Sequence, residues 1–211
     1  FREFLRMYMT AQYPERENYP EWNERQFVLD SIAWANDPLY GWCNKNLKKD
    51  GKPYNLNSDG LKVYTTVDSR MQRYAEEAVY GHVAKFLQPE FFKEKRRKRN
   101  APFSDALTAR QVEQIMDRSV RQSGRYIEMK AAGASEEEIR KAFRTPVEMS
   151  VFTYHGDIDT VMTPLDSIRY VKSFLRAGFM SMDPKTGEVK AYVGGLDYSH
   201  FMYDMVMNGR R

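Results

Sequence analysis

The clearest alternation of apolar and polar residues lies near the end of the chain. Residues 188–193 read Glu-Val-Lys-Ala-Tyr-Val, and this period of two is typical of a strand with one buried face. The five residues before it, 183–187, read Asp-Pro-Lys-Thr-Gly. They favour a tight turn, because proline fixes one φ and glycine accepts a positive one. We therefore predict an antiparallel hairpin of strands 179–182 and 188–193, with Gly187 at positive φ.

Two further stretches carry strand patterns. Residues 61–67 read Leu-Lys-Val-Tyr-Thr-Thr-Val, a β-branched alternating run that predicts a strand. Residues 149–154 and 160–162 flank His-Gly-Asp at 155–157 and predict a second hairpin. Since the strands at 61–67 and 179–193 each have an apolar face to bury, we expect them to come together in one scaffold.

Apolar residues spaced three and four apart predict helices over much of the remaining chain. Residues 1–10 and 26–34 indicate two short helices. Asp68 is a suitable N-cap for a helix that runs to about Leu87. The inner face of this helix is predicted to contain Met71, Tyr74, Ala75, Ala78, Val79 and Val83, with His82 at the edge of the core.

Residues 88–150 are predicted to form a helical insertion. Capping-box spacings begin at Thr108 and at Ser135, each with a glutamine or glutamate three residues later. Gly133 and Pro146 are the corresponding stop signals.

A third helix start is Thr163 followed by Pro164 and Asp166, and the helix that it opens is predicted to end at Gly178. Together these patterns predict an α+β fold, in which short antiparallel hairpins form a small scaffold that carries a helical insertion.

The composition limits the classes of protein to which the chain can belong. Its 211 residues suffice for one ordinary domain or two small ones, and a net charge of +4 is too mild to demand a nucleic-acid partner. A single cysteine, Cys43, excludes an intramolecular disulfide and a cysteine zinc site. No apolar run reaches the roughly 18 residues of a membrane span, and no signal peptide is present. Because the chain begins at Phe1, we interpret it as a segment whose targeting sequence, if it has one, lies upstream.

No metal or cofactor site is predicted. The three histidines are scattered without the spacing of zinc ligands, and no glycine-rich phosphate loop occurs. His155, Asp157 and Asp159 lie close together in the sequence, but a polar hairpin turn explains them better than a metal site.

Several features of the sequence resemble class A, bifunctional penicillin-binding proteins. The terminal hairpin, the Gly194-Gly195 pair and the closing residues 208–211, Asn-Gly-Arg-Arg, are similar to the start of the transpeptidase domain of that family. Residues 60–68, Gly-Leu-Lys-Val-Tyr-Thr-Thr-Val-Asp, resemble a segment between its glycosyltransferase and transpeptidase domains. The resemblance covers most of the chain, and the residues between these segments match only in outline.

The resemblance implies a division of the chain into four parts. Residues 1–60 correspond to a linker after the glycosyltransferase domain, with a helix and irregular structure. Residues 61–87 add a strand and a helix to the linker scaffold, 88–150 form the helical insertion, and 151–211 supply a hairpin, a helix and the first strands of the transpeptidase domain.

The resemblance also implies a parent enzyme that polymerises lipid II glycan and cross-links stem peptides on the periplasmic side of the bacterial inner membrane. In that family a Gln-x-Gly-Ser-x-x-Lys segment with the nucleophile follows such a Gly-Arg-Arg within a few residues, and this chain stops before it. No serine here has a lysine three residues later, and no Glu-Asp pair of the glycosyltransferase type occurs. Lys185-Thr186-Gly187 matches the third transpeptidase signature, but it precedes the expected nucleophile and turn chemistry explains it. We therefore assign no catalytic, cofactor-binding or metal-binding residue.

The expected partners are the neighbouring glycosyltransferase and transpeptidase domains and a regulator of cell-wall assembly, with peptidoglycan contact as a further option. An aromatic group could form a carbohydrate platform, although packing into a small core is the favoured interpretation. Its members are Trp34, Leu39, Tyr40, Trp42 and Tyr54.

The alternative function is a stand-alone basic module that binds nucleic acid or another polyanion. It depends on the run Lys-Glu-Lys-Arg-Arg-Lys-Arg at 93–99. Acidic residues nearly balance the basic ones over the whole chain. A solvated helix face or loop is therefore the favoured interpretation of this run, and nucleic acid is the less favoured partner.

Overall fold

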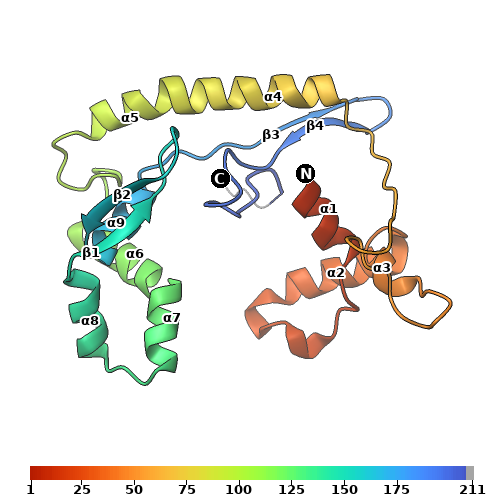
Figure 1. Ribbon diagram of the computed structural model, residues 1–211, viewed down its shortest axis with the longest axis horizontal. Helices are drawn as coiled ribbons and strands as arrows, with labels where there is room; N and C mark the ends of the chain where they lie inside the picture. Colours follow the sequence, from red (N-terminus) through yellow and green to blue (C-terminus); the bar gives the residue numbers. More distant parts are fainter. Residues whose placement is uncertain (208–211) are drawn as a thin grey trace. The chain divides into compact units, whose positions relative to one another are not determined.

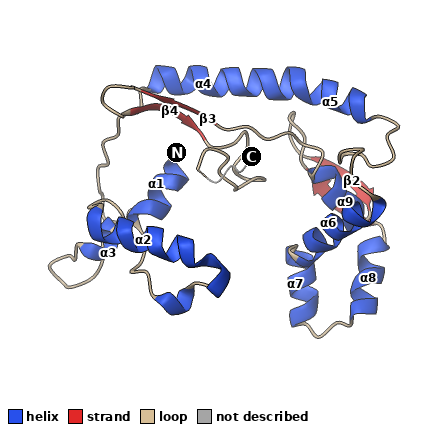
Figure 2. Ribbon diagram, turned by 180° about the vertical axis from the view of Figure 1, so that it is seen from behind, coloured by secondary structure: helices blue, strands red, loops and turns tan. Residues whose placement is uncertain are grey.

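The chain folds into two compact units, residues 1–66 and the residues from Val67 onward. The computed structural model describes residues 1–207 except for the side chain of Trp22, so the Asn-Gly-Arg-Arg sequence at 208–211 lies outside the described residues. Helices and two short antiparallel sheets are both present in the described part (Figure 1; Figure 2), which confirms the predicted α+β class. The division into four functional parts stays a prediction.

The first unit is helical. Its elements are α1 (Arg2–Met9), the 3-10 turns η1 (Arg16–Asn18) and η2 (Glu21–Asn23), α2 (Glu24–Asn36) and α3 (Trp42–Lys45). The predicted helices at 1–10 and 26–34 are confirmed, and the second is longer than predicted at both ends. Met9 and Cys43 are buried in this unit.

A close backbone approach fixes the path of the chain between α2 and α3. Gly41 has a φ of +70°, and a Cβ added there would lie 2.3 Å from the Trp34 ring and 2.9 Å from the Ala11 carbonyl oxygen. The Gly41 N–H donates to the Tyr8 carbonyl (2.9 Å), and the Tyr8 hydroxyl donates to the Asp37 carboxylate. Burial and this hydrogen bond raise the pKa of Tyr8 to about 12. Only glycine fits this position, because it adopts a positive φ without strain and has no Cβ to clash with the neighbouring atoms.

The aromatic group of the first unit does not form one surface. Trp34 and Tyr40 lie edge to face with 6.5 Å between ring centroids, and Trp42 contacts Tyr54 separately at 5.1 Å. The Lys45 ammonium lies 4.8 Å from the Trp34 ring and donates to two carbonyl oxygens. These contacts favour the interpretation of the group as core packing.

The second unit begins with an uninterrupted helical run. The run consists of α4 (Ser69–His82), the π-helical turn η3 (Val83–Leu87) and α5 (Gln88–Lys95), which follow one another without a break (Figure 1). As predicted, the Asp68 carboxylate caps the run by accepting from the N–H groups of Arg70 and Met71.

The prediction that this helix ends near Leu87 is wrong, because the run continues to Lys95. Pro89 lacks an N–H group and would clash with a regular preceding turn. The π turn relieves this conflict, since the Gln88 N–H donates to the Val83 carbonyl five residues earlier. The predicted start of a separate insertion at residue 88 therefore falls inside a continuous helix.

The inner face of α4 covers one strand of a hairpin (Figure 1; Figure 2). Four small apolar side chains meet there: Ala75, Val79, Ala191 and Val193. Gln72 adds two hydrogen bonds to the strand. Its Nε2 donates to the Tyr192 carbonyl (2.9 Å), and the Tyr192 N–H donates to its Oε1 (2.8 Å).

The buried stripe of α4 and η3 is narrower than predicted, because a two-stranded hairpin is too narrow to cover it. Ala75 and Val83 are buried and Val79 packs beside them. The remaining predicted positions and the predicted core-edge histidine are exposed: Met71, Tyr74, Ala78 and His82.

Helices α6 (Ala109–Arg121), α7 (Gly124–Ala131) and α8 (Glu136–Arg144) come next. Both predicted capping boxes form, at Thr108 and at Ser135, with the two reciprocal hydrogen bonds each. Helices α6 and α8 both pack on α9 (Pro164–Val171). The buried side chains of α6 and α8 are Val112, Met116, Ile139 and Phe143.

The predicted hairpin around residues 155–157 is confirmed with shifted strand bounds. Strands β1 (Val147–Val151) and β2 (Ile158–Met162) pair antiparallel in one sheet. Thr163 caps α9 by accepting from the Asp166 N–H. The helix ends at Val171, before the predicted stop at Gly178, because the next residues leave it to bond with Gln88.

Strands β3 (Phe179–Met182) and β4 (Val189–Val193) form the second antiparallel sheet, with a bulge between Ser181 and Met182. The turn between them is confirmed, with Gly187 at a φ of +76°. The Asp183 carboxylate accepts from the N–H groups of the next residues. The Lys-Thr-Gly sequence at 185–187 therefore lies in a tight turn.

The strand predicted at 61–67 does not form. Within the described residues this stretch has no partner strand, and Val63 and Tyr64 are 44% and 88% exposed. The Asp68 N–H donates to the Lys190 carbonyl (3.0 Å) just beyond it. An alternating pattern gives a strand only where a neighbour supplies a ladder of hydrogen bonds.

Alanine at the two glycine turns should destabilise the chain by different amounts. Gly187→Ala should cost about 1 kcal/mol of the free energy of unfolding, the penalty of a positive φ alone, because no atom lies within 4 Å of the added Cβ. Gly41→Ala adds the clash with Trp34 and should cost about 2–4 kcal/mol. All three tryptophans lie in the first unit, so their fluorescence during urea unfolding reports that unit, and circular dichroism reports both. A neutral Gly187→Ala would contradict the turn.

Candidate functional site, an aromatic junction

Aromatic rings from three separate segments meet in the second unit. Phe152, Phe174 and Phe201 are buried in one cluster, against which Tyr154 and Tyr170 pack. We call these five residues the aromatic junction. They come from the loop after β1, from α9 and its exit, and from the segment after β4.

The rings of the junction meet mostly edge to face. Phe152 lies 5.0 Å from Phe174 and 5.1 Å from Phe201, measured between ring centroids. Arg176 places its guanidinium carbon 4.5 Å from the Phe201 centroid on the outside of the cluster. Such contacts between buried rings are each worth about 0.5–1.5 kcal/mol beyond the area that they bury. The cluster therefore holds three segments that are distant in sequence.

Tyrosine hydroxyls join two of these segments, the loop after β1 and α9 with its exit, and they join the loop to α4. The Tyr170 hydroxyl donates to the Phe152 carbonyl (2.8 Å), and the Tyr154 hydroxyl donates to the Leu175 carbonyl (3.0 Å). Tyr80 of α4 donates to the Tyr154 carbonyl (2.5 Å). Burial raises the pKa values of both Tyr154 and Tyr170. These phenols therefore stay protonated hydrogen-bond donors near neutral pH.

A buried glutamine joins the long helical run to the exit of α9. Gln88 is 2% exposed. Its Nε2 donates to the Ser173 carbonyl (2.9 Å), and the Leu175 N–H donates to its Oε1 (2.8 Å). The amide thus satisfies one acceptor and one donor at the point where the chain leaves the helix.

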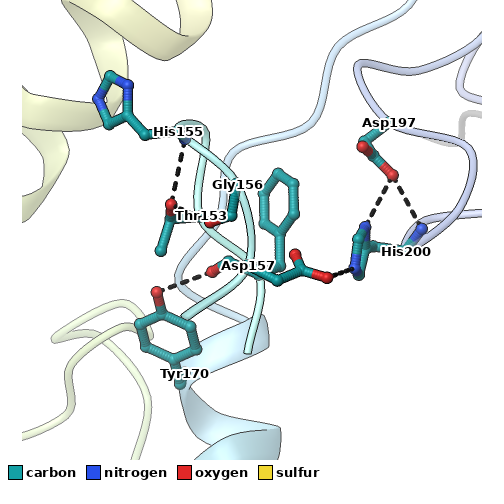
Figure 3. A network of polar contacts seen from close by, with 8 residues as sticks. Thr153, His155, Gly156, Asp157, Tyr170, Asp197 and His200 are labelled. Atoms are coloured by element: carbon teal, nitrogen blue, oxygen red, sulfur yellow. Dashed lines mark hydrogen bonds and ion pairs between the residues drawn. The ribbon is translucent and has the colours of Figure 1, made fainter. Parts of the chain in front are cut away.

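His200 links the segment after β4 to the loop after β1. Its Nδ1 lies 2.9 Å from the Asp197 carboxylate, and its Nε2 lies 3.1 Å from the Asp157 carboxylate (Figure 3). The imidazole also lies 4.9 Å from the Phe152 ring. The hydrogen bond to Asp197, reinforced by Asp157, raises the pKa of His200 above its usual value. Burial alone would raise the pKa of Asp197, but the bond to His200 holds it below its usual value.

From the sequence, Asp157 is expected in a polar turn beside His155 and Asp159, with no pairing to His200. The His155 ring points away from the pair (Figure 3), and only the His155 N–H bonds locally, to Thr153. The Asp197-x-x-His200 spacing is a local signal for half of the contact. Asp157 lies 43 residues from His200, and no sequence pattern reveals that partner.

The hydroxyls nearest the junction are engaged with the backbone. Ser167 donates to the Pro164 carbonyl (2.9 Å), and Ser173 donates to the Tyr170 carbonyl (2.5 Å). A nucleophilic serine needs a base that accepts its proton, and these two donate to carbonyl oxygens instead. The arrangement suits packing and positioning. The assignment of no catalytic residue stays a prediction.

The basic run at 93–99 lies at the end of α5 and in the turn that follows. Its residues are exposed except for Lys95, which is half-buried. Lys93 pairs with Glu90 (2.6 Å), and Lys98 pairs with Glu94 (3.4 Å). The favoured interpretation of the run as a solvated helix end and loop therefore agrees with its position.

One comparison with known proteins gives a match. Residues 98–175 match the family model described as the penicillin-binding protein middle domain. The match spans a little over a third of the chain and supports a relationship of this part to penicillin-binding proteins. The searches of curated proteins and of solved structures found no match. Among the described residues, none of the helices has both the length and the apolar character of a membrane span.

Removing the buried amide should destabilise the second unit. Gln88→Ala leaves the Ser173 carbonyl and the Leu175 N–H without their partner, which should lower the free energy of unfolding by about 2–3 kcal/mol. The matched control is Gln114→Ala at an exposed position of α6. This substitution should change the free energy of unfolding by less than about 0.5 kcal/mol. Urea unfolding followed by circular dichroism measures both. Equal stability of the two variants would show that the two hydrogen bonds of the Gln88 side chain contribute nothing.

The His200 contacts should stabilise the second unit more in mild acid than in base. A raised pKa gives a contribution that is fully present below the unfolded value of about 6.5 and is lost as pH rises through the folded value. His200→Gln should therefore lower the melting temperature more at about pH 5.5 than at about pH 8.5. The exposed His155→Gln is the control and should show no such difference. A pH-independent effect of His200→Gln would rule out the charged contact.

Proposed function

We propose that the chain is a non-catalytic connecting part of a bifunctional peptidoglycan synthase. It lies between a glycosyltransferase and a transpeptidase domain and keeps them positioned relative to each other. The observation that carries this proposal is the match of residues 98–175 to the penicillin-binding protein middle domain. The parent protein would act in cell-wall assembly on the periplasmic side of the bacterial inner membrane.

The aromatic junction supports a positioning role. Four of its five aromatic residues lie within the matched range, and Phe201 lies beyond it, in the segment that resembles the start of a transpeptidase domain. The ring contact of Phe152 with Phe201 and the contact of His200 with Asp157 join these two regions. A connection of this kind transmits orientation better than a flexible linker, because packed cores resist continuous deformation.

The contacts of the serine hydroxyls support the non-catalytic part of the proposal. Ser119, Ser167 and Ser173 all donate to carbonyl oxygens of the preceding turn. Three residues after Ser173 stands Arg176 rather than a lysine, and its guanidinium lies over the Phe201 ring. A regulator of cell-wall assembly is the proposed partner besides the two neighbouring domains.

The alternative of a stand-alone polyanion-binding module has less support. Acidic neighbours already pair with Lys93 and Lys98 in the basic run. A groove that tracks a nucleic-acid backbone needs cations along its length, whereas this run covers a single helix end and turn.

Incubation with a fluorescent penicillin tests both the non-catalytic role of the chain and the proposed parent enzyme. The 211-residue chain should form no covalent adduct in intact-mass spectrometry, because none of its serines has a paired lysine. The same chain, extended by the codons that follow Arg211 in its gene, should be acylated, since the resemblance places the nucleophile there. An adduct on the shorter chain would contradict the non-catalytic role, and an unreactive extended chain would contradict the proposed parent.

A further inference from the structure

An open groove of about 440 Å³ lies between α5, the loop 96–103 and α9. Its lining is mainly apolar and includes Phe91, Phe92, Pro102, Met162 and Tyr170. Phe92 remains 42% exposed although its ring contacts Phe174 of the aromatic junction at 6.0 Å. The lining of the groove is therefore packed against the aromatic junction, and no side chain of the described residues fills the groove.

Cations stand around this apolar lining. Lys95, Arg96 and Arg169 contribute to the groove walls. Lys95 donates to the Phe103 carbonyl and Arg169 donates to the Ala101 carbonyl, both at 3.3 Å. These two bonds hold the loop against both helices. The Lys95 ammonium also pairs with the Glu94 carboxylate at 3.6 Å. The Arg169 guanidinium carries five donors, of which the bond to Ala101 uses one.

The lining of the groove contains one acidic side chain, and this side chain already accepts a hydrogen bond. Asp166 is the acidic residue of the lining, and its carboxylate accepts from the Thr163 hydroxyl at 2.6 Å. Arg96, Arg97 and Arg99 have no ion pair within residues 1–207, whereas the neighbouring Lys98 has two. The surroundings of the groove therefore carry unbalanced positive charge.

The turn that carries these arginines has a defined and uncommon conformation. Arg97 has a φ of +71°, which is unfavourable for a residue with a Cβ and persists only where the surroundings enforce it. The turn is closed by the Lys98 N–H, which donates to the Lys95 carbonyl (3.1 Å). The arginines next to the groove are thus carried by a turn with a defined backbone conformation.

We propose that this groove binds an acidic peptide segment of another protein, with a bulky apolar side chain inserted between α5 and α9. The apolar lining accepts the side chain, and the surrounding cations attract the flanking carboxylates. Insertion into a lipid bilayer requires apolar side chains that protrude from the surface, whereas the apolar side chains here line a groove. Stacked bases require open ring faces, whereas Phe92 meets the ring of Phe174 edge to face. The proposal does not depend on the proposed function.

Fluorescence anisotropy with three rhodamine-labelled peptides and the complete chain tests the proposal. The probe is Gly-Glu-Asp-Leu-Phe-Glu-Asp-Gly. One control replaces Leu-Phe with Ser-Ser, and the other replaces the acidic residues with Lys and Arg. The probe should bind at least about tenfold more tightly than either control. Raising the salt from about 50 to about 500 mM should weaken the binding without abolishing it, because the apolar part is not screened.

Variants locate the binding on the groove. Arg96→Glu changes an exposed residue and should weaken binding of the probe about fivefold or more, whereas Arg125→Glu on α7 makes the same charge change elsewhere and should leave it within about twofold. Phe92→Ala should also weaken it. Circular dichroism checks that each variant is folded, and the wild-type amide signals of Ala101 and Arg169 should shift in NMR spectra when the probe is added.

Several outcomes would overturn the proposal. Equal binding of the probe and the Ser-Ser control would mean that charge alone is recognised. Equal weakening by Arg96→Glu and Arg125→Glu would place the site elsewhere. Displacement of the probe by phosphatidylglycerol vesicles or by a single-stranded oligonucleotide, at lower concentration than by unlabelled probe, would assign the surface to a membrane or to nucleic acid. Absence of binding by all three peptides at millimolar concentration would also reject it.

Discussion

The side-chain amide of Gln88 satisfies a carbonyl and an N–H group at the exit of α9, and the second unit depends on this contact. Gln72, on the same helical run, makes an equivalent pair of bonds to the Tyr192 backbone of β4. Two glutamines thus attach the exit of α9 and the terminal hairpin to one helix. The π turn between them contributes, because it places an extra residue in the turn and so rotates the residues that follow.

Around this framework, the aromatic junction joins the region that matches a penicillin-binding protein middle domain to the segment after β4. Its phenylalanines are buried, its tyrosines donate to carbonyl oxygens, and His200 adds a charge-dependent contact at its edge. The nearby hydroxyls of Ser167 and Ser173 donate to backbone carbonyl oxygens. The connecting role that we propose for the chain needs such packing rather than reactive side chains.

The groove and the junction are physically adjacent. Tyr170 belongs to both, and Phe92 of the groove contacts Phe174 of the junction. A partner seated in the groove would therefore touch the residues that hold the terminal segment. The cations beside the groove are placed by backbone contacts of Lys95 and Arg169, so the charge and the apolar lining form one surface.

The sequence by itself determined the local structure: the caps at Asp68, Thr108, Ser135 and Thr163, the turn at Gly187, and the positions of both hairpins. These features depend on neighbouring residues, whose chemistry the sequence displays directly. Only the tertiary structure decided which apolar faces found partners. It left residues 61–67 without a partner strand among the described residues, and it paired Gln88 with the exit of α9 and Asp157 with His200. Contacts between residues so far apart depend on how the helices pack, and no local pattern carries that information.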